Sequence, residues 1–132
     1  MTTAVDSSVL LDVLGADPDF GETSRRALRA AYDVACDVVW AEVRAHFPSD
    51  EAFAEAVDIL GARFNPITPA AAQTAGRLWR ESWTRTRQQG RNRVIADFLI
   101  GAHAQIQADG LLTRDRGFYR RYFSGLRVVD AG

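Results

Sequence analysis

The sequence contains no lysine, since all 16 of its basic residues are arginines. This excludes chemistry that needs a lysine, including that of the phosphoacceptor receiver domains. The Gly-Lys-Ser/Thr element of a P-loop is absent, as is the glycine-flanked serine elbow of the α/β-hydrolases. A haloacid-dehalogenase-like phosphatase requires Asp-x-Asp at its first strand, and Asp6-Ser7-Ser8 lacks the second acid.

Cysteine and long apolar runs are also scarce. The single cysteine, Cys36, cannot form an internal disulfide, which is typical of a reducing compartment. No apolar run approaches the roughly 20 residues needed to span a bilayer. The N-terminal residues 1–6 lack the basic and apolar regions of a secretion signal. We therefore expect a cytoplasmic protein.

What the sequence does contain is a regular alternation of short apolar stretches and helical patterns. Its 132 residues, 47% hydrophobic and 25% charged, predict one soluble domain over residues 1–132. Strands are expected at residues 3–6, 34–36, 63–67, 111–113 and 126–130, with Pro66 placing the third at an edge. Helices are expected at residues 9–14, 17–32, 37–47, 50–62, 68–89, 94–108 and within 114–123. This order predicts an α/β fold with a parallel sheet and helices on both faces.

The helix expected at residues 94–108 is apolar on nearly every side, and we place it in the middle of the domain. Asn92 can cap it. It carries one acid, Asp97, in its first turn, and a buried carboxylate must be paired, bound to a metal or open to a cleft. Gly101, one turn later, is expected to keep that face open for a metal or a phosphate.

Four acidic residues fall where an open parallel sheet forms its sites, at the carboxyl ends of its strands. Asp6 ends the first strand, Glu42 lies early in the helix after the second, Asp97 begins the central helix and Asp115 follows the fourth strand. Each alone is explained as a helix cap or a solvated charge. Gathered together they would repel, and Mg²⁺ or Mn²⁺ with oxygen ligands would relieve that repulsion.

Four motifs carry a family resemblance: Val5-Asp6-Ser7-Ser8, Trp40-Ala41-Glu42-Val43, residues 96–104 and residues 112–118. In order and spacing they resemble the PIN-domain ribonucleases, most closely the VapC-type toxins of type II toxin–antitoxin modules. The resemblance covers essentially the whole chain and implies a three-layer α/β/α fold with a short, mostly parallel sheet of about four to five strands.

The resemblance also implies the activity and its residues. Such proteins are Mg²⁺- or Mn²⁺-dependent endoribonucleases that leave 5′-phosphate and 3′-hydroxyl ends. Asp6, Glu42, Asp97 and Asp115 match the acidic catalytic and metal-binding positions, and Thr113 matches a hydroxyl that orients the site. Ser7 or Ser8 would act likewise beside Asp6. A cognate antitoxin silences the toxin, and homodimers are common in the family.

Two groups of arginines are candidates for RNA contact. Residues 85–93 contain Arg85, Arg87, Arg91 and Arg93 and no acid, and they lead directly into the Asp97 helix. An acidic site repels RNA, so a basic rim would hold its phosphates. A solvated helix end is the other explanation. Arg114 and Arg116 flank Asp115 and either pair with carboxylates or touch phosphate.

A non-catalytic PIN-like module that binds RNA or a protein is the alternative function. All four acidic positions are filled, which favours the nuclease. Metal binding among Asp6, Glu42 and Asp97 distinguishes the two.

Overall fold

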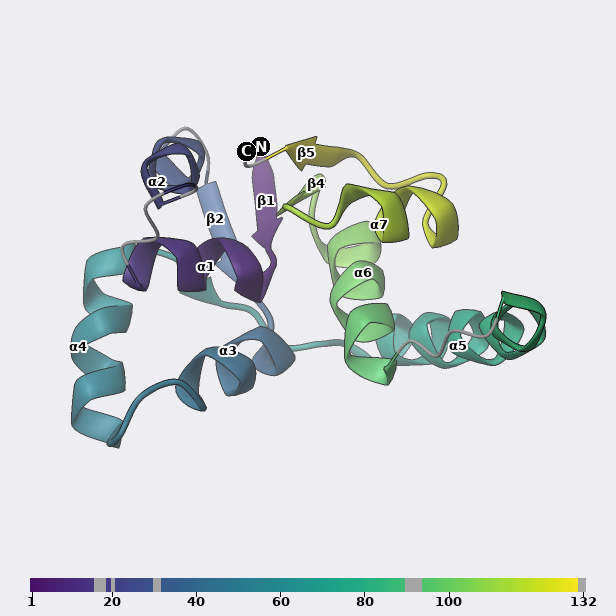
Figure 1. The fold of residues 1–132 in the computed structure, drawn as a ribbon, viewed down its shortest axis with the longest axis horizontal. Coiled ribbons are helices and arrows are strands. Elements are labelled where there is room, and N and C mark those ends of the chain that lie inside the picture. The colour runs from purple at the N-terminus through teal and green to yellow at the C-terminus, as the bar shows by residue number, and fades with distance from the viewer. Residues whose placement is uncertain (16–18, 20, 30–31, 90–93, 131–132) are drawn as a thin grey trace.

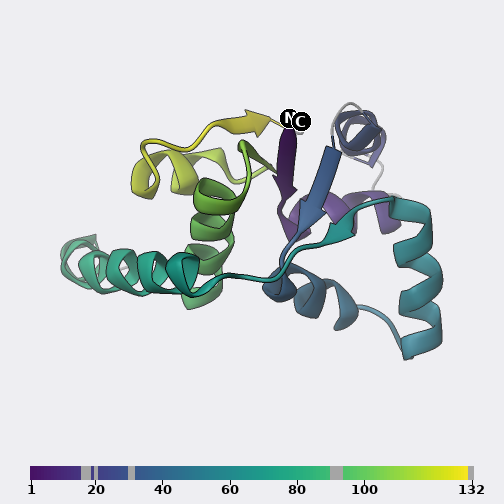
Figure 2. The same ribbon diagram turned by 180° about the vertical axis from the view of Figure 1, so that it is seen from behind.

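The computed structural model describes residues 1–15, 19, 21–29, 32–89 and 94–130. Strands and helices alternate along the chain (Figures 1 and 2). The strands are β1 (Thr2–Val5), β2 (Tyr32–Ala35), β3 (Arg63–Phe64), β4 (Gly110–Thr113) and β5 (Val128–Asp130). The helices are α1 (Ser7–Leu14), α2 (Gly21–Arg29), α3 (Asp37–Arg44), α4 (Asp50–Leu60), α5 (Pro69–Gln89), α6 (Ile95–Gln107) and α7 (Arg116–Tyr122).

The five strands form one sheet in the order β3-β2-β1-β4-β5, and each neighbouring pair is parallel. In Figures 1 and 2, α1 and α2 lie to one side of β1 and α5 and α6 to the other. The predicted three-layer α/β class is thereby confirmed. The short strand before Pro66 lies at the sheet edge, as expected of a segment whose proline cannot donate to a ladder.

The core is centred on β1, β4 and α6. Val5, Leu111 and Leu112 are almost completely buried, and so is Phe98 of α6. Burial of each such side chain stabilises the fold by roughly 1.5–3 kcal/mol. The packed core therefore holds the carboxyl ends of β1 and β4, at which Asp6 and Thr113 lie, in a fixed position.

Several local predictions hold because a short stretch of sequence decides them. Ser49 accepts a hydrogen bond from the Ala52 N–H at 3.1 Å and caps α4, and Thr68 caps α5 through the Ala71 N–H at 3.3 Å. Gly61 ends α4 with a φ of 72°, a conformation that favours glycine.

Other boundaries differ from the prediction. The first strand ends at Val5, so Asp6 is the residue that precedes α1 rather than the last residue of the strand. The predicted cap Asn92 lies outside the described residues, and Val94 occupies the N-cap position of α6. In the ranges that the structure describes, no helix is both long and apolar enough to cross a membrane.

Candidate active site

Asp6 lies at the carboxyl end of β1 and is buried, with 7% of its surface exposed. Its N–H donates to the Leu112 carbonyl of the neighbouring strand at 3.0 Å. Its carboxylate accepts a short hydrogen bond from Thr113 Oγ1 at 2.7 Å, and longer ones from the Ser7 and Ser8 hydroxyls at 3.4 and 3.5 Å. The hydroxyl that the sequence predicts to orient the site therefore contacts Asp6 directly.

Glu42 lies on α3 and is half-buried beside the same serine. Ser7 Oγ is 3.1 Å from Glu42 Oε1 and 3.4 Å from Asp6 Oδ1. The Ser7 hydroxyl therefore lies between the carboxylates of Asp6 and Glu42, although Glu42 is 35 residues further along the chain than Ser7. Asp97, also half-buried, lies in the first turn of α6, which packs against α3.

Asp115 completes the predicted acidic set from the loop after β4. It occupies the N-cap position of α7 with an exposed side chain. Its N–H donates to Thr113 Oγ1 at 2.9 Å, the same oxygen that donates to Asp6. Thr113, fully buried, therefore links the backbone of Asp115 to the carboxylate of Asp6.

The carboxylates influence one another electrostatically. Burial raises the pKa of Asp6, and the negative charge of Asp115 raises it further, while the hydrogen bonds from Thr113 and Ser7 oppose the shift. Burial also raises the pKa of Glu42, and the charges of Asp6 and Asp97 add to this increase. The four predicted acids therefore share one electrostatic environment in which negative charge is crowded.

The side-chain oxygens of this site are chemically suited to a hard divalent cation. They are carboxylate and hydroxyl oxygens, which Mg²⁺ and Mn²⁺ prefer, and their crowded negative charge favours a cation. Within the described part of the chain, no three His, Cys, Asp or Glu side chains already converge on a point that could hold a metal ion. The arrangement is a set of neighbouring acidic side chains rather than a closed cage, as repulsion between like charges predicts.

The arginines that the sequence predicts to contact RNA lie in different surroundings. Arg114 forms a bidentate ion pair with Asp12 of α1, with Nε–Oδ2 and Nη2–Oδ1 distances of 2.6 and 2.8 Å. Of its two expected roles, the structure shows pairing with a carboxylate outside the predicted acidic set. Arg116 begins α7 and is exposed. Arg85 and Arg87 lie in the last turns of α5, and Arg91 and Arg93 lie outside the described residues.

Sequence reasoning missed Asp12 and assigned Gly101 wrongly. Asp12 lies in a run of aliphatic residues, Val9-Leu10-Leu11-Asp12-Val13-Leu14, and a lone acid there is the signal that could have marked it as buried and paired. A Cβ on Gly101 would overlap the ring of Phe123, so this glycine makes room for core packing. It does not keep a face open for a ligand.

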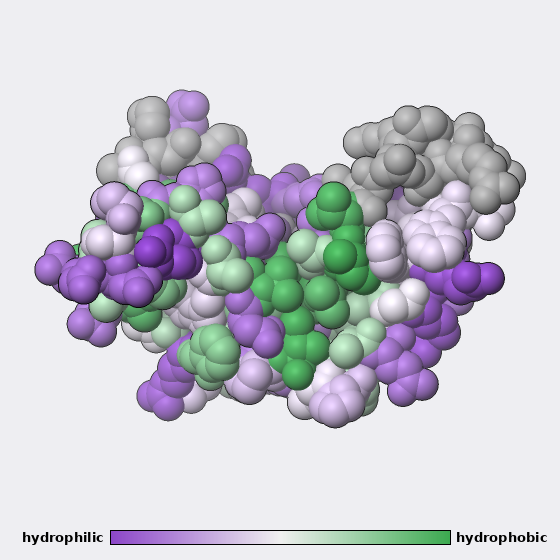
Figure 3. Space-filling model, turned by 90° about the horizontal axis from the view of Figure 1, so that it is seen from below, coloured by the Kyte–Doolittle hydropathy of each residue, from purple (hydrophilic) through white to green (hydrophobic). Residues whose placement is uncertain are grey.

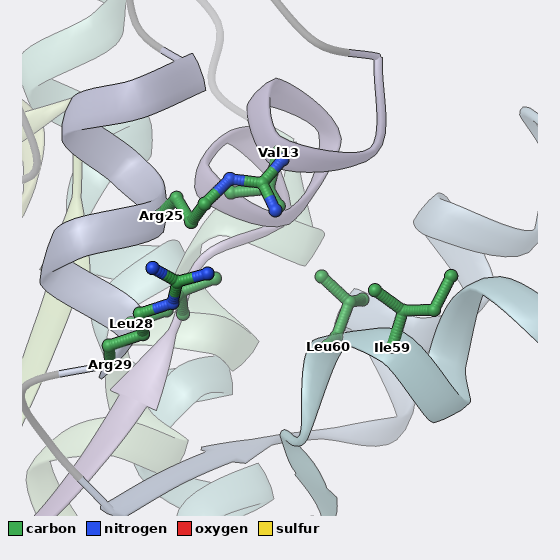
Figure 4. A pocket seen from close by; sticks show the side chains of 6 residues that line it. All are labelled: Val13, Arg25, Leu28, Arg29, Ile59 and Leu60. Atoms are coloured by element: carbon green, nitrogen blue, oxygen red, sulfur yellow. The ribbon is translucent and has the colours of Figure 1, made fainter.

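A pocket lies apart from the acidic residues, between α1, α2 and α4 (Figure 4). Arg25 and Arg29 project from α2 across a floor that includes Val13, and Ile59 and Leu60 face them from the end of α4. None of the predicted catalytic residues lines this pocket.

Comparisons with known proteins show which family the chain belongs to. The family model of the PIN domain matches residues 3–124. No curated protein matches the sequence. Among solved structures, VapBC2 from Rickettsia felis bound to a promoter DNA fragment matches with a TM-score of 0.72 and 18% identity, covering 98% of both chains.

Two further structures show the same fold at similar distance in sequence. A toxin–antitoxin complex from Klebsiella pneumoniae matches with a TM-score of 0.72 and 19% identity over 98% of each chain. VapC20 from Mycobacterium tuberculosis, a toxin that cleaves the sarcin–ricin loop, matches with a TM-score of 0.66 and 17% identity, covering 95% of this chain and 98% of that one.

Proposed function

Because the chain belongs to the PIN-domain family, we propose that it is a single-domain, metal-dependent endoribonuclease and the toxin of a type II toxin–antitoxin pair. The single observation that carries this proposal is the crowding of carboxylates around Asp6. Burial and the charge of Asp115 both raise the pKa of Asp6, and three hydroxyls point at it. A protein that only bound RNA would gain nothing from concentrating negative charge at its binding surface.

The proposed roles follow from the contacts. Asp6, Glu42, Asp97 and Asp115 would hold Mg²⁺ or Mn²⁺, and Thr113 orients the Asp6 carboxylate through its 2.7 Å hydrogen bond. Ser7 holds Glu42 near Asp6. When bound, the cation supplies an activated water and neutralises charge on the phosphoryl group during cleavage.

The RNA would be held by cations outside this acidic centre. We assign phosphate contact to Arg116 and to the basic stretch that contains Arg85, Arg87, Arg91 and Arg93. Arg116 is exposed at the start of α7, next to Asp115. Its guanidinium can therefore balance the repulsion between the acidic centre and a phosphate.

The antitoxin is proposed to occupy the pocket between α1, α2 and α4. The pocket combines apolar side chains with Arg25 and Arg29, as Figure 4 shows. This surface suits a segment that carries apolar and acidic side chains. We place both partners in the cytoplasm. Two of the compared structures are described as toxin–antitoxin assemblies, VapBC2 of Rickettsia felis and the complex of Klebsiella pneumoniae.

A homodimer is also proposed. Figure 3 shows an apolar area near the centre of one face of the molecule. An exposed apolar area of this kind marks a surface for a partner. Independently of that view, Val94, directly before α6, is 63% exposed. Sedimentation of the purified protein tests this, and a monomer at all concentrations contradicts it.

The nuclease proposal is tested with Asp97→Asn. The purified protein is expected to cleave single-stranded RNA with Mn²⁺ and not with EDTA. Asp97→Asn should lose cleavage while its circular dichroism and melting curve match the wild type. Asp58→Asn, an exposed acid on α4, serves as the matched control and should cleave normally.

The opposite results identify the alternative. RNA binding without cleavage, together with no Mn²⁺ binding by calorimetry, would leave a non-catalytic binding module. Full activity in Asp97→Asn would show that Asp97 is not part of the catalytic site.

A further inference from the structure

Arg114 forms a bidentate ion pair with Asp12, whose carboxylate is buried, while the arginine side chain keeps 33% of its surface exposed. Asp12 is only 4% exposed, and Arg114 meets it with two nitrogens at 2.6 and 2.8 Å. Ser24 of α2, fully buried, donates a third hydrogen bond to Asp12 Oδ2 at 3.1 Å. Three elements, α1, α2 and the loop after β4, therefore meet at one carboxylate.

Stability alone does not account for this pair. Burying the Asp12 carboxylate costs about as much as its attraction to Arg114 returns, and water screens the exposed part of Arg114, so the pair adds little net stability. A bidentate arginine–carboxylate contact does fix geometry, because two parallel hydrogen bonds set both distance and orientation.

The pair attaches the loop after β4 to α1 at a second point. The first point is Thr113, which donates to Asp6 immediately before α1. The second is the next residue, Arg114, which binds Asp12. Asp6 and Asp12 are six residues apart, about 9 Å along the helix axis. Two attachments at that separation prevent the loop from pivoting about Thr113.

Asp115 is the residue whose place depends on these attachments. Its side chain is exposed, and its backbone, with φ −97° and ψ 60°, is neither helical nor extended. Its N–H is bound to Thr113. The position from which its side chain starts, relative to Asp6, is therefore set by the backbone of residues 113–115.

We propose that the Asp12–Arg114 ion pair is a positioning pair that fixes Asp115 relative to Asp6 and so sets the affinity of the site for a divalent cation. The inference rests on the proposed function. It also gives Arg114 a role other than RNA contact, because Nε and Nη2 of its guanidinium are already bound to Asp12.

The experiment measures Mn²⁺ affinity by calorimetry on the full chain. Asp12→Asn and Arg114→Gln should each weaken Mn²⁺ binding about 10-fold, the size expected for removal of a group that orients metal ligands. The double variant should lose no more than either single one, because both remove the same contact. Arg114→Lys should fall between, since an ammonium cannot pair in the bidentate manner.

Two further measurements separate positioning from a merely structural role. Hydrogen exchange at the Asp115 amide should accelerate in Asp12→Asn and Arg114→Gln, although the amides of β4 stay protected. RNA binding measured in EDTA should be unchanged in both variants. Arg120→Gln, an exposed arginine on α7, is the control and should keep wild-type Mn²⁺ affinity.

Other outcomes overturn the inference. Variants that melt earlier but bind Mn²⁺ like the wild type would make the pair structural only. Weaker RNA binding by Arg114→Gln, with Mn²⁺ affinity intact, would make Arg114 an RNA contact. If the wild type binds Mn²⁺ and these variants do not differ from it, this inference alone fails. If the wild type binds no Mn²⁺, the proposed function fails with it.

Discussion

The two ends of α6 contact polar clusters that are built in opposite ways. At its second half, His103 Nε2 lies 2.7 Å from Asn65 Oδ1, and Gln107 donates to that oxygen at 3.0 Å. Gln107 also donates to the Pro66 carbonyl and accepts from the Thr68 N–H. An amide oxygen can only accept, so His103 carries its proton on Nε2. Donors and acceptors are matched.

At its first turn, Asp97 faces a cluster of like negative charges. Asp6 and Glu42 share the Ser7 hydroxyl, and each has its pKa raised first by burial and then by neighbouring negative charge. A matched cluster stabilises one arrangement and needs nothing more. A cluster of like negative charges is relieved by a cation or by protons. Crowded negative charge, rather than the number of polar residues, therefore distinguishes the cluster that fits a cation from the one that only holds the fold together.

The largest expected effect comes from neutralising the acidic cluster. Asp6→Asn should reduce RNA cleavage by about 10³-fold, because a lost metal ligand removes several kcal/mol of transition-state stabilisation. The same change should raise the melting temperature in EDTA at pH 7, because the folded state holds the Asp6 carboxylate at a raised pKa. Thermal melts and cleavage assays on one preparation check both. A lower melting temperature in EDTA would mean that the cluster stabilises the fold and that the contrast is false.

The next effect belongs to the packed half of α6. Gly101→Ala should destabilise the fold by about 3 kcal/mol, because its Cβ would overlap the buried Phe123 ring and the core would be overpacked. Urea unfolding measures this, and Gly76→Ala, where a Cβ meets no neighbour, is the matched control. An unchanged midpoint would show that the face is open after all, as the sequence suggested.

A smaller loss should follow from opening the matched cluster. Asn65→Ala leaves His103 Nε2–H and one Gln107 donor without their acceptor, which costs about 2 kcal/mol. Mn²⁺ affinity and cleavage per folded molecule should stay at the wild-type level, measured by calorimetry and an RNA assay. A selective loss of Mn²⁺ binding would show that the polar clusters at the two ends of α6 act as one site.

The smallest effect concerns a buried acid far from both clusters along the sheet. Burial raises the pKa of Asp33 on β2 to about 7, and its Oδ1 has no hydrogen-bond partner among the residues that the structure describes. The folded state then binds more protons than the unfolded chain between pH 4 and 7, so this group lowers stability as pH rises through that range. Burial lowers the pKa of His103, which has the opposite effect on stability below pH 6.5.

Asp33→Asn separates these two contributions. It should stabilise the fold by about 1 kcal/mol at pH 8, where the wild-type carboxylate is charged, and by less at pH 5, where it is protonated. The gain stays small because the buried amide would also lack a hydrogen-bond partner. Urea midpoints at both values check this, and cleavage should be unaffected. Equal stabilisation at both pH values would show that the charge of the Asp33 carboxylate is not the cause.

Sequence reasoning was most accurate where a short segment decides the outcome. The caps at Ser49 and Thr68, the edge strand before Pro66 and the parallel alternation all depend on neighbouring residues. The structure brings Asp6, Glu42, Asp97 and Asp115 into mutual electrostatic range, and their roles as ligands stay a prediction.

What escaped the sequence depends on partners far away in the chain. Gly101 is explained by Phe123, and Arg114 by Asp12, a residue 102 positions earlier. No local pattern identifies such a partner. A lone acid in an aliphatic helix shows that a cation is needed, but not which of 16 arginines supplies it.

The hydrogen bond between Thr113 and Asp6 also determines when the protein becomes complete during its synthesis. It joins residues 107 positions apart, and β4, which carries Thr113, is the fourth of five strands. A chain still growing on the ribosome has Asp6 long before it has Thr113 or Asp115. Contacts this distant form late, because closing the long loop is costly until the sheet rewards it. The nascent chain therefore lacks the assembled centre until Thr113 and Asp115 have been translated, which would delay the proposed RNA cleavage until then.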